Sequence, residues 1–135
     1  MIIGAAQTPV SKVEVDDDSI VYWRYDAGAV VDLEAATEEV RLIQELTNEV
    51  LTDGCYLLID IRPITSIDRA SRRLFASEEV SQNKGVPVQA LALVIGSPVG
   101  RVVGNFWFKL NIPPHPTRLF ATEEDAQAWL LDQQA

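Results

Sequence analysis

Apolar and polar positions along the chain predict an alternation of strands and helices. Residues 10–15 alternate between apolar and polar side chains, and residues 20–25 are rich in β-branched and aromatic side chains, so the polar segment between them suggests a hairpin. Asp32 can cap a helix whose apolar positions recur at helical spacing up to Leu51. Gly54 ends this helix, because glycine readily adopts the left-handed conformation beyond a helix C-terminus.

The middle of the chain continues the alternation with two more apolar runs. Residues 56–61 and 90–95 are almost continuously apolar, as expected of central strands that are covered on both faces. Between these strands, a second helix is expected to start near Asp68 and to end before Gly85.

The last third of the chain predicts two further helices and a short strand. Apolar residues recur at three- and four-residue steps from Val99 to Leu110, so one face of a third helix should be buried. The prolines within residues 113–116 prevent its continuation, and residues 118–120 suit an edge strand. Thr122 can then cap a final helix, whose acidic first turn suits the helix dipole.

These elements define a single domain of the α/β class. Their order is β-β-α-β-α-β-α-β-α, which predicts a mixed sheet of about five strands with four helices over residues 10–132. Residues 1–9 are expected to form an N-terminal tail or the start of the first strand. A chain of 135 residues with 47% hydrophobic side chains is large enough to bury one continuous core.

Charge and cysteine content exclude several classes of function. The 20 acidic and 11 basic side chains give a net charge of −9, which repels nucleic-acid phosphates and anionic lipid surfaces. Cys55 is the only cysteine, which excludes an internal disulfide and a cysteine-built zinc site. No run reaches the ~18 apolar residues of a membrane span, and the first ten residues lack the basic stretch of a secretory signal. We therefore expect a cytoplasmic protein without nucleic acid, stable membrane insertion, metal or cofactor.

Residues 57–68 carry a resemblance to a known family. Leu57-Leu-Ile-Asp-Ile61, a loop, Ser66-Ile-Asp68 and then a helix resemble the STAS fold of anti-sigma-factor antagonists. The chain is more closely similar to the uncharacterised bacterial proteins grouped as STAS/CRAL-TRIO-related. The likeness covers about residues 10–131 and includes the segments Leu58-Ile-Asp-Ile-Arg62, Ser97-Pro-Val-Gly-Arg-Val-Val-Gly-Asn-Phe106, Thr117-Arg-Leu-Phe120, Glu123-Glu-Asp-Ala126 and Trp129-Leu130.

The resemblance implies a regulatory module that lacks the family's usual switch. STAS antagonists are switched by phosphorylation of a serine at the start of the helix that follows the strand, the loop and an aspartate. By this resemblance, Asp68 matches the aspartate, Arg69 lies where a serine is common, and Ala70 occupies the phosphorylated position. Alanine has no hydroxyl group. Ser71, the next residue, is rotated by about 100° around the helix.

Charged and hydroxyl side chains gather after the two central strands, where α/β folds often bind ligands. If these strands are adjacent and parallel, the loops after them converge, and a small anion or a phosphorylated partner could meet the guanidinium groups of Arg62 and Arg101. The alternative is that these arginines pair with nearby acids at the surface. The candidate rim for a ligand or partner consists of Arg62, Ser66, Asp68, Arg69, Ser71, Ser97 and Arg101.

Two further surfaces have competing interpretations. Gly100, Gly104 and Phe108 share a four-residue spacing that would let another backbone approach closely, either in a homodimer or against the final helix. Several aromatic side chains could line an apolar pocket for a lipid, but their periodic positions favour core packing for most of them. These side chains are Tyr22, Trp23, Tyr25, Phe106, Trp107 and Phe108.

Three other features offer little chemistry. His115 lies in a proline-rich loop without an evident catalytic partner. Cys55 precedes an apolar strand, where a thiol often behaves as a small buried hydrophobe. Asp16-Asp-Asp18 could attract calcium, although a polar hairpin turn is the favoured interpretation. Since no nucleophile lies beside an evident base, the sequence predicts no catalytic residues.

The leading hypothesis is a non-enzymatic regulatory or protein-interaction module that self-associates and binds a protein partner of unknown identity. The alternative is a carrier that encloses a small apolar or anionic ligand between the sheet and the third helix. A weaker third hypothesis is an enzyme that uses Arg62, Asp68 and Arg101.

Overall fold

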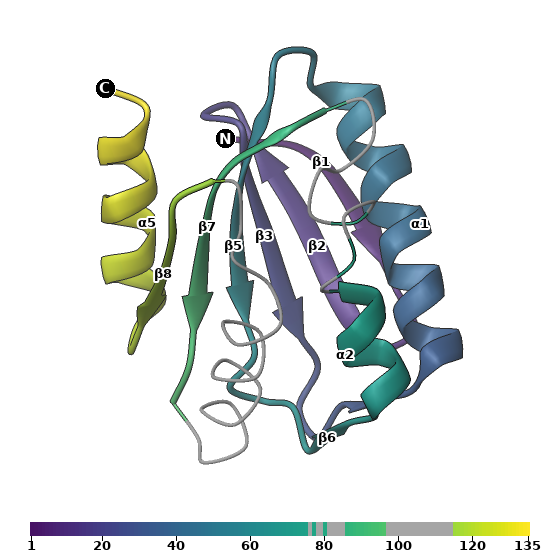
Figure 1. Cartoon of the computed structure of the whole chain (residues 1–135). Coiled ribbons are helices and arrows are strands. Elements are labelled where there is room, and N and C mark those ends of the chain that lie inside the picture. The colour runs from purple at the N-terminus through teal and green to yellow at the C-terminus, as the bar shows by residue number, and fades with distance from the viewer. Residues whose placement is uncertain (76, 78–79, 81–85, 97–114) are drawn as a thin grey trace.

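A computed structural model of the chain describes residues 1–75, 77, 80, 86–96 and 115–135 (Figure 1). Strands and helices alternate through most of these residues, as the apolar pattern predicted. The elements are β1 (Ile2–Gln7), β2 (Ser11–Asp16), β3 (Ile20–Tyr25), β4 (Val30–Val31), α1 (Leu33–Val50), β5 (Cys55–Asp60), β6 (Ser66–Ile67), α2 (Arg69–Phe75), β7 (Val88–Val94), β8 (Thr117–Phe120) and α5 (Glu123–Gln133).

Six strands form one mixed sheet in the order β1-β2-β3-β5-β7-β8. β1, β2 and β3 are antiparallel neighbours, whereas β3, β5, β7 and β8 run parallel to one another. In the parallel part, Trp23 lies opposite Ile59, and Ile59 lies opposite Leu93. β4 and β6 form a separate parallel pair beside this sheet.

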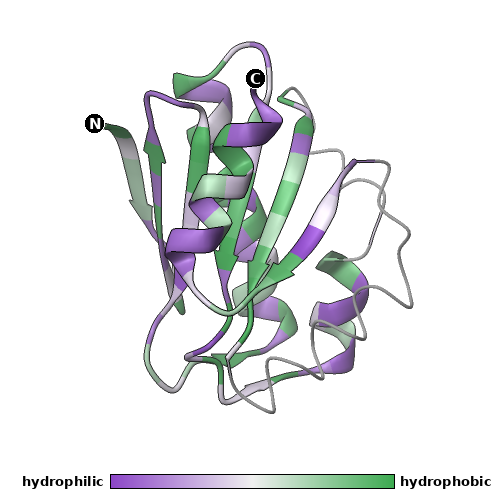
Figure 2. Ribbon diagram, turned by 90° about the vertical axis from the view of Figure 1, so that its left-hand side faces the viewer, coloured by the Kyte–Doolittle hydropathy of each residue, from purple (hydrophilic) through white to green (hydrophobic). Residues whose placement is uncertain are grey.

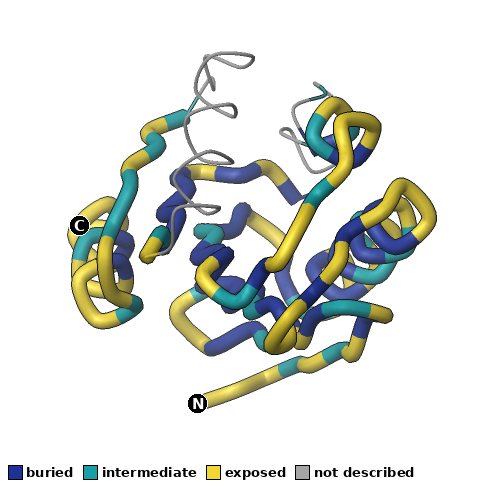
Figure 3. Tube along the Cα trace, turned by 90° about the horizontal axis from the view of Figure 1, so that it is seen from below, coloured by how far each residue is buried: buried dark blue, intermediate teal, exposed yellow. Residues whose placement is uncertain are grey.

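Helices cover both faces of the sheet. Figure 1 shows α1 and α2 on one face and α5 on the other, and Figure 3 shows these layers from below. Trp23 and Ile59 belong to the core under α1 and α2, while Tyr22 and Leu58 belong to the core under α5. This division follows from the two-residue alternation of side chains along a strand. In Figure 2, α5 lies in front of strands whose residues are mostly apolar.

The first helix begins where the sequence predicted, but it ends at Val50, four residues before Gly54, which does not adopt the expected left-handed conformation. The Asp32 carboxylate accepts a hydrogen bond from the Ala35 amide at 2.8 Å, which caps the start of α1. Ile43 and Leu46 are buried on the face toward the sheet. The Leu51 amide donates to the Thr47 carbonyl at the other end.

The chain start differs from the sequence expectation. Residues 2–7, expected to be a tail or the start of the first strand, form the separate strand β1, so the sheet has six strands instead of about five. The absence of a side chain at Gly4 lets β1 lie close to α1, since a Cβ atom there would be 3.0 Å from Leu46 Cδ1. The sequence did not indicate β4 and β6, which have two residues each.

Part of the predicted helical structure cannot be compared. The third helix, expected at residues 99–110, lies outside the described residues. The expected second helix corresponds to α2, but residues 76, 78–79 and 81–85 near its expected end also lie outside them. Among the described residues, no helix combines the length and the apolar character needed to cross a bilayer.

A carboxyl group is buried between α1 and the sheet. Glu39 is 0% exposed, and its Oε2 atom accepts hydrogen bonds from Ser11 Oγ at 2.7 Å and Trp23 Nε1 at 2.8 Å. Its Oε1 atom accepts from the Tyr25 hydroxyl at 3.2 Å. These donors are neutral, and burial disfavours the charged carboxylate more than they favour it. The pKa of Glu39 is therefore raised to about 7.

We expect Glu39 to make the folded state less stable as pH rises. Its folded pKa of about 7 lies above its ordinary value of 4.5, so the folded protein keeps a proton that the unfolded chain releases. Between about pH 5 and about pH 8, this difference removes roughly 2–3 kcal/mol from the free energy of unfolding. Glu39→Gln imitates the protonated group and should remove this part of the pH dependence in urea unfolding monitored by tryptophan fluorescence.

Glu38→Gln is the matched control, because Glu38 is the neighbouring residue on α1, is partly exposed and pairs with Arg41. The control should retain the pH dependence of the wild type. Equal pH dependence in the wild type and Glu39→Gln would contradict the assignment.

Candidate functional site

The loops after β3 and β5 are joined into one edge of the molecule. The Gly28 amide donates to the Pro63 carbonyl at 3.0 Å, and the Thr65 amide donates to the Ala29 carbonyl at 2.8 Å. Val30 pairs with Ser66 between β4 and β6. We call residues 26–32 and 61–70, together with Gly96, the loop edge; it lies in the lower part of Figure 1. Parallel strands bring these segments together because their carboxyl ends point the same way.

Arg62 of the loop edge is held by an acidic side chain from the end of β5. Its Nε and one terminal nitrogen donate to the two carboxylate oxygens of Asp60 at 2.9 and 2.7 Å. Asp60 is buried, and its hydrogen bond raises the pKa of Arg62. This ion pair is the arrangement that the sequence offered as the alternative to an anion site.

The segment after β7 meets the same arginine. A Cβ atom at Gly96 would lie 2.9 Å from Arg62 Cδ, so any other residue here would have to displace part of the Arg62 side chain. Ser97 and Arg101, which the sequence placed in the same rim, lie outside the described residues. Within the described residues, the contact between Arg62 and Gly96 shows that the segments after β5 and β7 meet, as the sequence predicted.

The start of α2 is organised by Asp68. Its carboxylate accepts a hydrogen bond from the Ser71 amide at 2.7 Å, and hydrogen bonds from Ser71 lower the pKa of Asp68. Its own amide donates to the Val31 carbonyl at 3.0 Å, which ties the helix start to β4. Ser66, Asp68 and Arg69 are exposed, as is Ala70.

Ser71 differs from its neighbours because it is fully buried. Its hydroxyl oxygen is 3.5 Å from the Val31 carbonyl oxygen, to which it donates. The predicted rim therefore divides into Arg62 beside Gly96 and the exposed start of α2 beside β4, with Ser71 inside the protein.

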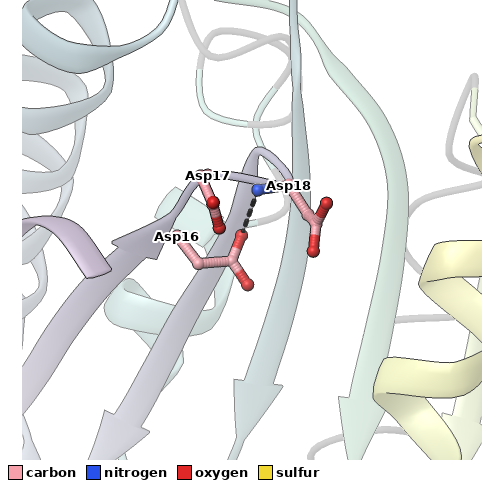
Figure 4. Close-up of side chains that lie close together, drawn as sticks. All are labelled: Asp16, Asp17 and Asp18. Carbon is pink, nitrogen blue, oxygen red and sulfur yellow. Dashed lines mark hydrogen bonds between the residues drawn. The ribbon is translucent and has the colours of Figure 1, made fainter. Parts of the chain in front are cut away.

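The three consecutive aspartates form a turn between β2 and β3 (Figure 4). One oxygen of the buried Asp16 accepts from the amides of Asp18 and Ile20 at 2.9 and 3.0 Å, and the other accepts from the Tyr22 hydroxyl at 2.9 Å. Carboxylate oxygens of the three residues lie within 4.8 Å of one another, close enough to hold a cation. However, both carboxylate oxygens of Asp16 already accept hydrogen bonds within the turn and from Tyr22. This arrangement indicates a structural role for Asp16.

The other sequence candidates are mostly part of the core. Cys55 is fully buried, and Trp23 and Tyr25 pack 5.7 Å apart between their ring centres in the core under α1. Burial lowers the pKa of the half-buried His115. The proposed dimer face of Gly100, Gly104 and Phe108 lies outside the described residues, as do Phe106 and Trp107.

A hollow beside the start of α1 was missed in the sequence. It has a volume of about 380 Å³ and is open to solvent. Its lining joins the β1–β2 turn, β4 and the first turns of α1, and consists of Pro9, Val10, Val30, Asp32, Glu34, Ala35 and Glu38. The available signal was a pair of apolar residues, Val30 and Leu33, on either side of a helix cap in an acidic segment.

Comparison with known proteins places the chain in a family and supports the fold. The family model described as a domain of unknown function, DUF7793, matches residues 13–134. The structure is similar to that of an uncharacterised protein of the DUF3478 family from Shewanella loihica PV-4, which has a SpoIIAA-like fold. That match has 18% identity and a TM-score of 0.59, and it covers 96% of this chain and 95% of the other. None of the curated proteins matches the chain. The STAS-like α/β fold predicted from the sequence is thus confirmed.

We expect Asp16→Ala to destabilise the protein, because it leaves two backbone amides and the Tyr22 hydroxyl without their acceptor. The cost should be about 2–3 kcal/mol in urea unfolding. Asp17→Ala is the control, since Asp17 is exposed and should change stability little. Millimolar calcium should leave the unfolding midpoint of the wild type unchanged. A calcium-dependent increase that Asp17→Ala abolishes would instead show that the turn is a cation site.

Proposed function

Because the chain belongs to the DUF7793 family and has a SpoIIAA-like fold, we propose that it is a non-enzymatic regulatory module that binds a protein partner through its loop edge. The observation that carries this proposal is the exposed start of α2. There the side chains of Ser66, Asp68 and Arg69 face solvent at the place where the resembling STAS antagonists carry their switch.

The state of the described polar groups supports binding more than catalysis. Arg62 is engaged by Asp60, and Asp68 is engaged by the backbone of α2. These interactions fix the shape of the loop edge, which lowers the entropy cost of association for a partner. Cys55 is buried, which withholds its thiol from a substrate.

The module is proposed to bind without a phosphoserine switch. Ala70 is exposed at the position of the switchable serine but has no hydroxyl, whereas Ser71 has a hydroxyl but is fully buried. A kinase would have to open the contact between α2 and Val31 to reach it. Without phosphorylation at either position, the proposed binding would depend on the concentrations of the two proteins.

Mass spectrometry of phosphopeptides from the protein isolated from its host should show Ser71 unmodified. Ser66, an exposed serine in β6 just before α2, serves as an internal comparison for accessibility. Stoichiometric phosphate on Ser71 would contradict the proposal that the protein binds its partner without a phosphoserine switch.

Affinity capture from the host should recover a protein partner with the wild type and much less of it with Arg69→Glu. The substitution reverses an exposed charge at the start of α2 without removing a buried contact. Arg118→Glu is the matched control, because Arg118 is an exposed arginine on β8, away from the loop edge. We expect a loss of at least about tenfold for Arg69→Glu alone, as for a charge at the centre of an interface.

Equal recovery of the partner with both variants would show that the interface lies outside the loop edge. Turnover of a substrate that is lost in Asp68→Ala would overturn the non-enzymatic role. A lipid that co-purifies in native mass spectrometry would favour the carrier alternative.

A further inference from the structure

The hollow beside α1 combines an apolar surface with exposed apolar neighbours. Pro9, Val10, Val30 and Ala35 provide its apolar lining. Val30 is 58% exposed, and Leu33, three residues further along the chain and outside the lining, is 46% exposed. Exposure of this apolar surface to water is unfavourable, and an apolar side chain of a partner would remove the surface from water.

The carboxylates around the hollow give it a negative field. Three acidic residues line the hollow, namely Asp32, Glu34 and Glu38, and residues 26–40 contain no lysine or arginine. The nearest cations along the chain already have acidic partners: Lys12 lies near Glu14, and Arg41 is shared between Glu38 and Glu45. The positive end of the α1 dipole is met by Asp32, which leaves Glu34 as additional negative charge in the first turn.

We infer that this hollow receives an apolar side chain of a protein partner, flanked in the partner's sequence by lysine or arginine. This inference rests on the proposed function and names the chemistry of the partner. An apolar side chain would contact Val10 and Val30, while the flanking cations would approach Glu34 and Glu38. Anionic ligands do not fit, because the surrounding carboxylates repel them. A lipid chain does not fit an open hollow whose rim is charged.

The hollow is continuous with the loop edge. Val30 lines the hollow and is paired with Ser66 through β4 and β6. Val31, the next residue, accepts hydrogen bonds from the Asp68 amide and the Ser71 hydroxyl at the start of α2. One partner segment can therefore contact the hollow and the exposed start of α2 together, with its cations at the hollow and its acids toward Arg69.

Nuclear magnetic resonance titration with capped tripeptides tests the chemistry directly. The probe is acetyl-Arg-Leu-Arg-amide, and acetyl-Glu-Leu-Glu-amide and acetyl-Arg-Gly-Arg-amide replace its charge and its apolar side chain. We expect weak, saturable shifts with the first probe at the amides of Val10, Val30 and Ala35, and at least about tenfold weaker binding of the other two. Absence of saturable shifts at these amides with the first probe would overturn the inference, as would equal binding of all three peptides.

Two variants separate the hollow from general attraction between opposite charges. Val30→Lys removes an apolar contact and adds a repelling charge, and should weaken the first probe at least about tenfold. Leu131→Lys is the matched control, because Leu131 is a similarly exposed apolar residue on α5 and should leave binding unchanged. Both variants should keep the amide spectrum of the folded protein, since both side chains are exposed. Equal weakening by the two substitutions would reduce the effect to net charge and contradict the inference.

The outcomes distinguish this inference from the proposed function. A captured partner that is lost with Arg69→Glu but retained with Val30→Lys would leave the module in place and show that the hollow is not part of its interface. Failure to capture any partner, with tripeptide binding at the hollow intact, would overturn the proposed function and leave the ligand chemistry of the hollow standing.

Discussion

The parallel pairing of β3, β5 and β7 is the constraint on which the rest of the structure depends. Parallel neighbours cannot be joined by tight turns, so the chain must cross between them through longer connections on the faces of the sheet. One consequence is burial from both sides, which explains the nearly continuous apolar sequence of β5 and β7. Another is that the carboxyl ends of these strands meet at one edge, where their loops contact one another.

Polar side chains near this sheet serve mainly to hold its connections in place. Asp60 fixes Arg62 at the end of β5, and Asp68 fixes the start of α2. Asp16 performs a similar task at the opposite end of β3, where its carboxylate closes the turn. Glu39 differs, because it is buried among neutral donors and couples the packing of α1 to protonation. These hydrogen bonds hold the connections in place, so the shape of the surface that carries the exposed polar groups is set before a partner binds.

The sequence predicted elements with strong periodicity better than it predicted contacts between loops. The start of α1 was predictable because Asp32 combines a capping side chain with a regular apolar face after it. β1 was not separated from a tail because Ile2–Gln7 lacks strict alternation, and its position depends on Gly4 fitting under Leu46. β4 and β6 have two residues each, too few to produce a periodic signal.

The candidate site was predicted only in part, because contacts between loops leave no periodic signal in the sequence. A charged segment after an apolar run indicated Arg62 and Asp68, but the sequence could not show that Asp60 would engage the arginine. It also could not show that Ser71 would turn into the core. The hollow joins Pro9 and Val10 of the β1–β2 turn to Val30 and Ala35, which are distant from them along the chain, so only the folded structure reveals it.

The central claim is that one continuous surface, from the hollow beside α1 to the start of α2, binds a protein partner. Hydrogen exchange of the backbone amides, measured with and without the captured partner, tests this claim most directly. The account predicts slower exchange on binding at Val10, in residues 30–35 and in residues 66–70, with little change in α5. Slower exchange confined to β8 and α5, with the surface beside α1 and α2 unchanged, would contradict it.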